Sequence, residues 1–226
     1  VPAAIGMRGN ISGALGSRLS TAIHSGLFVL SRRTDSIVAQ NVLAALTLSS
    51  VMSTFLAPVA WLVAALFGLG DTVSIADLLV VSVTGGFLAS IVVLVVSLTL
   101  ANQAANRGWD LDNVNAPIIS AVGDLVALPA LVIATGLAQH GRWTNTLAVV
   151  VAAIALAAGG VAVRSSLPVL RTVVRESLPI LAVAGCVLAV AGVAIEGEFE
   201  RLSNTPALLI LVPAALSSAG SLGGIL

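Results

Sequence analysis

Charged residues are scarce in this chain of 226 residues. Asp, Glu, Lys and Arg together make up 9% of the sequence, whereas hydrophobic residues make up 58%. A soluble domain contains about 25% charged residues, and a globule this poor in charge could not cover its surface with polar groups. The composition therefore excludes an ordinary soluble domain and suits a lipid bilayer. We predict an all-α, polytopic, integral membrane protein with several spans, residing in the plasma membrane.

An excess of charge of either sign is also absent. The ten basic residues, all of them arginine, balance ten acidic residues, and the net charge is zero. Such a chain has no basic field to attract nucleic acid, so we expect no nucleic-acid partner. Cys186 is the single cysteine, which excludes an intrachain disulfide and predicts a small buried apolar residue rather than a metal ligand.

Motifs of the common enzyme classes are missing as well. The sequence has no glycine-rich phosphate loop, no G-x-S-x-G, no H-E-x-x-H and no grouping of Ser, His and Asp. Catalysis by acid and base would need a positioned partner for any buried acid. We therefore expect no enzymatic activity and no catalytic cofactor.

Long apolar runs are what the sequence has instead. A membrane-spanning helix needs about 20 mostly apolar residues. The chain opens without Met in a glycine-rich segment of this kind, and it stops soon after the last such segment begins. We therefore expect a piece of a longer protein. The predicted segments are residues 1–30, 37–68, 74–106, 113–139, 144–164, 177–195 and 205–226.

The arginines between these segments predict the orientation. Basic residues near span ends favour the cytoplasmic side. If the first segment ends in the cytoplasm, six loop arginines lie inside and only two outside. The inside set is Arg32, Arg33, Arg107, Arg164, Arg171 and Arg175, and the outside set is Arg142 and Arg201.

The two ends of the chain resemble each other. The opening VPAAIGMRGNISGAL and the closing VPAALSSAGSLGGIL share a Val-Pro-Ala-Ala start and two spaced glycines, at an offset of 211 residues. One period contains six predicted spans, so the two copies would cross the membrane in the same direction. Parallel repeats of this kind occur in transporters.

Asp124 is the most informative polar residue. It lies near the middle of the 113–139 segment and, alone among the ten acidic residues, deep inside a predicted span. A carboxylate there costs several kcal/mol unless water, a cation or a partner compensates. It predicts a cation ligand or a proton carrier, and a protonated Asp hydrogen-bonded between helices is the alternative.

The neighbours of Asp124 favour an ion path. Ser120 and Gly123 keep the adjoining surface small, and Pro129 has no amide hydrogen, which leaves the Leu125 carbonyl free. Carbonyl oxygens beside a carboxylate suit a hard cation such as Mg²⁺.

Three asparagines are further candidates for the path. Asn113 and Asn115 lie at the cytoplasmic entrance of the same segment, where they could hold a hydrated ion or cap the helix. In the first segment Asn10, between Gly9 and Gly13, could reach a pore, and the alternative is close helix packing through the glycines.

Two stretches are similar to a known family. VPAAIGMRGNISGALGSRLSTAIHSG resembles the segment of MgtE-type magnesium transporters that carries a Pro followed by Gly-Asn. WDLDNVNAPIISAVGDLVALPAL resembles the last pore-lining helix of that domain, and RESLPILAVAGCVLAV resembles the opening of another copy. The Gly-Asn…SRLST form and the tandem copy look closest to solute carrier family 41 and its relatives.

The resemblance implies a fold and a division of the chain. It implies an MgtE-like transmembrane domain with parallel tandem repeats, in which two units of five helices surround one central pore. Residues 1–139 would be a first unit without its first helix, 144–164 a linking helix, and 165–226 the truncated start of a second unit. The partner of the first unit would be that second unit or the same unit of a homodimer.

The resemblance also implies an ion site. Asp124 matches the family's central Mg²⁺ ligand, and Ser120 matches a position that contributes a backbone carbonyl. The sequence departs from the bacterial pattern at Ala116, where that pattern has Asn, and the amide here is Asn115 instead. Cytosolic regulatory domains of the bacterial type are absent from these residues.

These observations favour transport of divalent cations, with Mg²⁺ as the transported and bound ion. The predicted metal ligands are Asp124, Ser120, Leu125, Asn115, Asn113 and Asn10. A proton- or sodium-coupled carrier, in which Asp124 carries the coupling charge, is one alternative. A membrane scaffold without transport, in which Asp124 joins helices, is the other.

Overall fold

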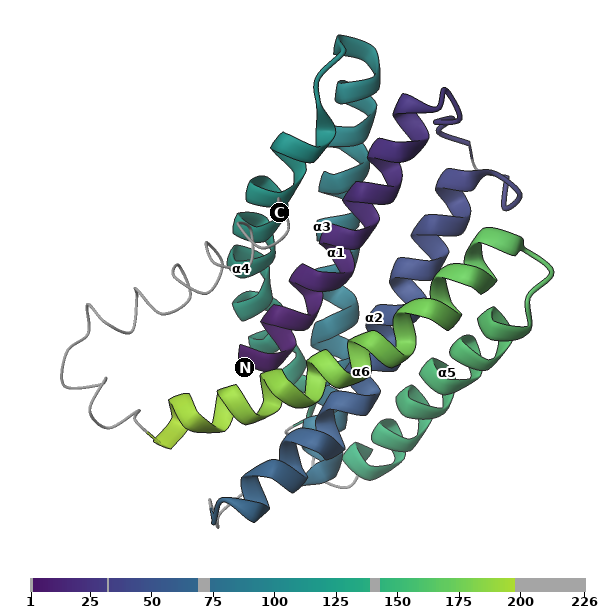
Figure 1. Ribbon diagram of the computed structural model, residues 1–226. Helices are drawn as coiled ribbons and strands as arrows, with labels where there is room; N and C mark the ends of the chain where they lie inside the picture. The colour runs from purple at the N-terminus through teal and green to yellow at the C-terminus, as the bar shows by residue number, and fades with distance from the viewer. Residues whose placement is uncertain (1, 32, 69–73, 139–142, 198–226) are drawn as a thin grey trace.

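A computed structural model describes residues 2–31, 33–68, 74–138 and 143–197, and within these ranges the regular structure is entirely helical (Figure 1). The six helices follow one another with short connections. They are α1 (Pro2–His24), α2 (Ile37–Leu66), α3 (Ile75–Arg107), α4 (Leu111–Ala138), α5 (Thr144–Arg164) and α6 (Pro168–Gly197).

Side-chain caps and one left-handed glycine set several of these boundaries. The hydroxyl of Ser36 accepts a hydrogen bond from the Ala39 amide at 3.2 Å, and that of Ser74 accepts one from the Ala76 amide at 3.3 Å. Each serine satisfies an amide that the first helical turn leaves without a partner. At the other end of α3, Gly108 adopts a φ of 69°, a conformation that stops a helix and that glycine adopts without strain.

Five helices are long and apolar enough to cross a membrane: α2, α3, α4, α5 and the part of α6 up to Val193. The boundaries of α2 to α5 agree with the predicted segments to within two residues. The prediction for α6 began too late, because the helix starts at Pro168 rather than at residue 177. Arg171, Arg175 and Glu176 lower the hydropathy of these first turns, whereas proline at the first position of a helix suits helix formation.

The first segment was predicted as a span over residues 1–30, and this was wrong in its extent. Helix α1 ends at His24, and the chain turns at Gly26, whose φ is 70°. Among the described helices, α1 also falls short of the hydropathy of the five candidate spans, because it carries Arg8, Arg18 and several glycines and serines. It nevertheless lies inside the bundle, in contact with α2, α3, α4 and α6.

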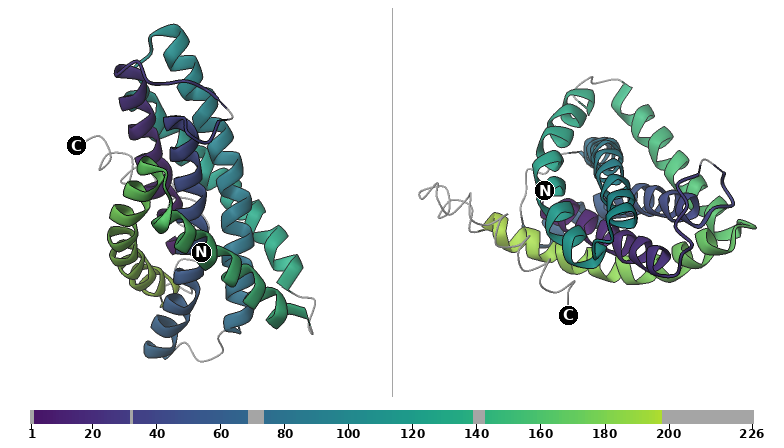
Figure 2. Two further views of the ribbon diagram at one scale, coloured as in Figure 1. Left: turned by 90° about the vertical axis from the view of Figure 1, so that its right-hand side faces the viewer. Right: turned by 90° about the horizontal axis from the view of Figure 1, so that it is seen from above.

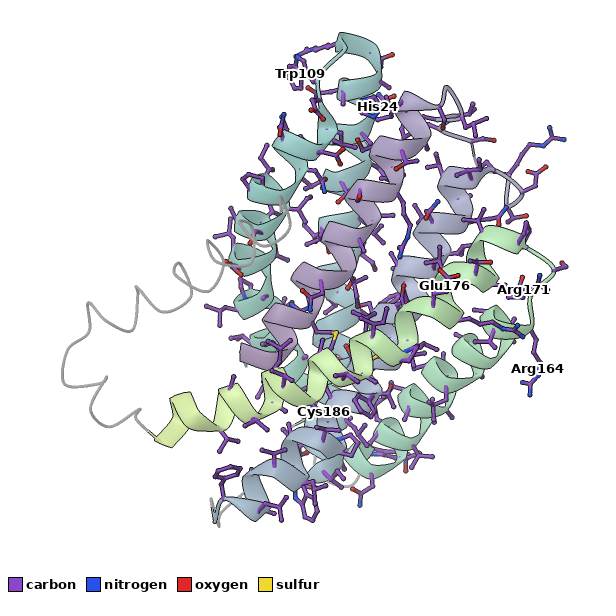
Figure 3. All side chains as sticks on the ribbon, in the orientation of Figure 1. His24, Trp109, Arg164, Arg171, Glu176 and Cys186 are labelled. Carbon is purple, nitrogen blue, oxygen red and sulfur yellow. The ribbon has the colours of Figure 1, made fainter. Side chains whose placement is uncertain are left out.

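The bundle has α1, α2 and α3 at its centre. Figures 1 and 2 show α4 beside α1 and α3, and α6 crossing α1 and α2 obliquely, with α5 along the outside of α2 and α3. The core consists of close-packed aliphatic residues such as Leu15, Leu19, Leu48, Met52 and Val174. The ends of α1 and α3 lie at the same end of the bundle, where Figure 3 labels His24 and Trp109.

Gln40 joins α2 to the start of α6. Its side chain is 4% exposed, and its Oε1 accepts hydrogen bonds from the amides of Val169 at 3.0 Å and Leu170 at 3.3 Å. Its Nε2 donates to the carbonyl of Asp35 at 3.0 Å. One buried amide therefore caps a helix that lies about 130 residues further along the chain.

Replacing Gln40 with Met should lower the midpoint of thermal unfolding in detergent. Met fills a similar volume but accepts no hydrogen bond, so two amides lose their acceptor at about 1–3 kcal/mol each. Gln103→Met, at a half-buried glutamine of α3, is the matched control. Equal midpoints for the two variants would contradict the capping role of Gln40.

One sequence prediction is wrong here, and two others concern residues that the structure does not describe. Cys186 was expected to be buried but is exposed, because it lies on the side of α6 that faces away from the bundle with Val183 and Val187. The predicted segment 205–226 and the second copy of the repeat, residues 212–226, lie outside the described residues.

Candidate functional site

Asp124 lies at the midpoint of α4. It follows Leu111 by 13 residues and precedes Ala138 by 14, which places it about 20 Å from either end of the helix. Its side chain is half-buried, and among the described residues no hydrogen bond or ion pair holds its carboxylate. Asp124 therefore lies near the middle of its helix, as the sequence predicted.

Two other predicted ligands lie within one turn of Asp124. Helix α4 continues through Pro129, which cannot donate to the carbonyl of Leu125 four residues earlier. The Leu125 side chain is 75% exposed and points outward, so only its carbonyl can serve an ion. Ser120 lies one turn before Asp124 and is half-buried.

Helices α1 and α4 run antiparallel and are joined near the start of α4. The hydroxyl of Ser20 donates to Oδ2 of Asp112 at 2.9 Å. One turn away, the side chain of Asn115 lies directly over Gly16, where a Cβ would come within 1.6 Å of its Nδ2. Only glycine at position 16 leaves room for this contact.

Further along, both helices carry glycines that face open space. A Cβ added to Gly9, Gly13 or Gly123 would meet no neighbouring atom within 4 Å. Continuing the register of the Gly16–Asn115 contact at equal rise along both helices places Gly9 level with residues 122–123 of α4. The open glycines of α1 are therefore level with Asp124, and Asn10 is exposed on the same stretch of α1.

The two asparagines of α4 lie apart from Asp124. Asn115 is 3% exposed, and its Oδ1 has no hydrogen-bond partner, which is unusual for a buried oxygen and suits a water or an ion. Asn113 is exposed at the helix start, where its Nδ2 donates to Oδ2 of Asp110 at 3.0 Å. Asn115 and Asn113 precede Asp124 by nine and eleven positions, so they lie about 14 and 17 Å from it along the axis.

Arg8 is a polar residue whose burial was not anticipated from the sequence. It is 6% exposed, and its Nη1 has no hydrogen-bond partner. The register of α1 and α4 places it level with Gly123 and Asp124. The only signal in the sequence was an arginine inside a glycine-rich helix, and that signal does not say which side of the helix faces the core.

The donor set around Asp124 is poor in acids. Among the residues that the structure describes, no group of three or more His, Cys, Asp or Glu side chains could hold a metal ion. A single carboxylate with carbonyl and hydroxyl oxygens suits a cation that keeps much of its water, as Mg²⁺ does.

The helices that carry these residues match a known protein family. The profile of the MgtE family, described as "Divalent cation transporter", matches residues 1–134. This chain belongs to the MgtE family. The match runs from α1 to the last turn of α4 and includes Asp124 and the other predicted ligands, whereas α5 and α6 lie outside it.

Individual relatives agree with the family. The MgtE-family chain is 29% identical over 160 residues to solute carrier family 41 member 3 of Rattus norvegicus and to the same protein of Mus musculus. These alignments cover 69% of the chain but 34% of the rat protein and 33% of the mouse protein. The chain therefore spans about a third of the length of these relatives. No solved structure matches it significantly.

Family and helices together confirm the predicted class. Five apolar helices of membrane-spanning length and an MgtE domain make the chain an all-α, multi-pass integral membrane protein. The resemblance to MgtE-type transporters and to solute carrier family 41 is confirmed by the same comparisons.

Proposed function

We propose that this MgtE-family chain is part of a transporter that passes divalent cations, and specifically Mg²⁺, across the membrane. The observation that carries the proposal is Asp124, a half-buried carboxylate at the midpoint of α4 with no protein partner among the described residues. An acid in the middle of a bilayer needs compensation for its charge. A passing divalent cation provides that compensation directly.

The ion would bind with most of its water in place. Asp124 supplies the negative charge, while the Leu125 carbonyl and Ser120 supply neutral oxygens within one turn of it. At an effective dielectric constant of 20, a carboxylate and a divalent cation 4 Å apart attract by about 8 kcal/mol. The water that the ion would lose offsets part of this attraction, so a single carboxylate can bind the ion and still release it.

The asparagines would serve at other depths. Asn115, with its unpartnered buried oxygen, is a station between the cytoplasmic end and Asp124, and Asn113 belongs to the entrance. Asn10 is on the exposed stretch of α1 that is level with the open glycines. In this proposal an ion moves between successive oxygens rather than into one enclosed cage.

A second unit would complete the pathway. Helix α4 packs mainly on α1 and α3, and its other side exposes Leu125, Leu128 and Val132. A second MgtE-like unit facing this side would cover the exposed side of α4 and form a pore with it. That unit would be the one proposed to begin at residue 165, after the linking helix 144–164, or the same unit of a homodimer partner.

Proton- or sodium-coupled transport is the second candidate, and the same observation favours it. A carboxylate without a protein partner can bind a proton or Na⁺ in place of a divalent ion. Asp124 would then carry the coupling charge, and the flux would depend on a second gradient.

Flux into liposomes tests both candidates. The full-length protein is reconstituted with a Mg²⁺-sensitive dye inside, and Mg²⁺ is added outside, first without and then with an imposed pH or Na⁺ gradient. We expect Mg²⁺ entry above that of empty liposomes without any second gradient, and slower entry of Ca²⁺. Entry only under a pH or Na⁺ gradient would establish the coupled carrier instead. Absence of flux under every gradient would refute both.

A further inference from the structure

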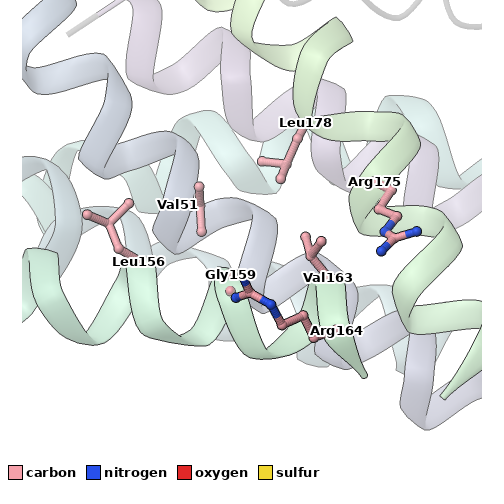
Figure 4. A pocket seen from close by; sticks show the side chains of 8 residues that line it. Val51, Leu156, Gly159, Val163, Arg164, Arg175 and Leu178 are labelled. Carbon is pink, nitrogen blue, oxygen red and sulfur yellow. The ribbon is translucent and has the colours of Figure 1, made fainter. Parts of the chain in front are cut away.

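A cleft lies between α2, α5 and α6, away from Asp124 of α4. Its volume is about 410 Å³, which is within the usual range of small-molecule sites. Figure 4 shows aliphatic side chains from all three helices with two arginines among them. The cleft is lined by Val51, Leu156, Val163, Leu178, Arg164 and Arg175, together with two glycines.

Charge and apolar surface are separated along this cleft. Arg164 is the last residue of α5, and Arg175 lies in the second turn of α6, so both flank the short connection between these helices. Leu156 is eight residues before Arg164, about 12 Å deeper along α5. The cleft is thus basic toward the end that the arginine distribution predicts to be cytoplasmic, and aliphatic toward the middle of the helices.

Both arginines are available to an anion. Among the described residues neither one makes an ion pair, and both are exposed. The nearest acid in sequence, Glu176, lies close enough to Arg18 of α1 to interact with it electrostatically. Arg171 lies one turn before Arg175, at the edge of the molecule with Arg164 (Figure 3), and adds to the positive charge.

Two glycines of α5 shape the cleft. A Cβ on Gly159 would come within 2.7 Å of Cγ2 of Val51, so this glycine allows α5 to approach α2 closely. A Cβ on Gly160 would meet only the Nη1 of Arg164, at 3.7 Å. The Arg164 side chain therefore folds back along α5 over Gly160 instead of extending away from the helix.

We propose that this cleft binds an anionic phospholipid of the cytoplasmic leaflet, with its phosphate between Arg164 and Arg175 and an acyl chain along the aliphatic wall. The outer faces of α5 and α6 are apolar, with Val161 71% and Ile180 69% exposed, so lipid surrounds the cleft in the membrane. Guanidinium groups recognise phosphate oxygens through paired hydrogen bonds, and basic pockets between spans suit anionic headgroups. Free phosphate would leave the aliphatic wall unused.

Binding of phosphatidylglycerol tests this proposal without reference to transport. The full-length protein in a non-ionic detergent is titrated with phosphatidylglycerol or phosphatidylcholine, and bound lipid is measured by native mass spectrometry. We expect wild-type protein to retain phosphatidylglycerol in preference to phosphatidylcholine. Arg164→Gln with Arg175→Gln should weaken its binding about thirtyfold, which corresponds to about 1 kcal/mol for each arginine.

Matched variants separate the cleft from general surface charge. Arg33→Gln with Arg107→Gln removes the same charge from two other loop ends and should bind like wild type. Gly160→Leu keeps both arginines but fills the cleft, and it should also weaken binding. Unchanged binding in the Arg164/Arg175 variant, an equal loss in the Arg33/Arg107 variant, or full displacement of the lipid by millimolar inorganic phosphate would overturn the proposal.

Discussion

Replacing Asp124 with Asn is expected to reduce Mg²⁺ uptake into liposomes at least about tenfold. The amide has the size of the carboxylate and can still hydrogen-bond, but it carries no charge. A loss of 1.4 kcal/mol in ion binding is enough for a tenfold effect, and one carboxylate contributes more than that to a divalent cation nearby. The measurement is the initial rate of dye response at a fixed outside concentration of Mg²⁺.

Loss of transport by this variant can be told apart from loss of folding. Asp124→Asn removes a charge from the middle of the bilayer, so its thermal midpoint in detergent should equal or exceed that of wild type. Asp77→Asn, in the first turn of α3, removes a carboxylate at a helix end and should keep full uptake. Wild-type uptake by Asp124→Asn would refute the role of this carboxylate as an ion ligand, while leaving transport itself in place.

Replacing Gly16 with Ala is expected to disrupt the contact between α1 and the Asn115 side chain of α4 and to destabilise the protein. The added methyl group would lie 1.6 Å from Nδ2 and 2.5 Å from Cγ of Asn115, and overpacking of this kind costs about 1–3 kcal/mol. For a chain of this length each kcal/mol corresponds to about 2–4 °C in the unfolding midpoint. Uptake should fall as well, because this contact sets how closely α1 approaches α4, the helix that carries Asp124.

A second-site change tests the cause. Asn115→Ala in the same protein removes the atoms that the new methyl group meets, so the double variant should recover most of the midpoint lost by Gly16→Ala. Gly13→Ala is the matched control, because a Cβ at that position meets no neighbouring atom within 4 Å and should not lower the midpoint. A double variant that is no more stable than Gly16→Ala alone would show that Asn115 is not the obstacle.

Predicting the helices and the depth of Asp124 needed only the sequence, because hydropathy and helix rise are properties of consecutive residues. Helices α2 to α5 end within two residues of the predicted positions, and Asp124 lies at the midpoint of its helix. The prediction failed where charged residues occur in the first turns of a helix, as in α6. It also failed for the length of α1, because the arginines and glycines of this helix leave no clear hydropathy boundary.

Which predicted residues lie together was decided only by the packing of helices that are distant in the chain. The antiparallel register of α1 and α4 places Asn115 against Gly16 and brings open glycines of α1 level with Asp124. The burial of Arg8, the cap that Gln40 provides for α6 and the cleft beside Arg164 and Arg175 also arise between helices. Local patterns determine where a helix begins and how apolar it is, whereas the side it turns toward each neighbour depends on contacts that no single segment contains.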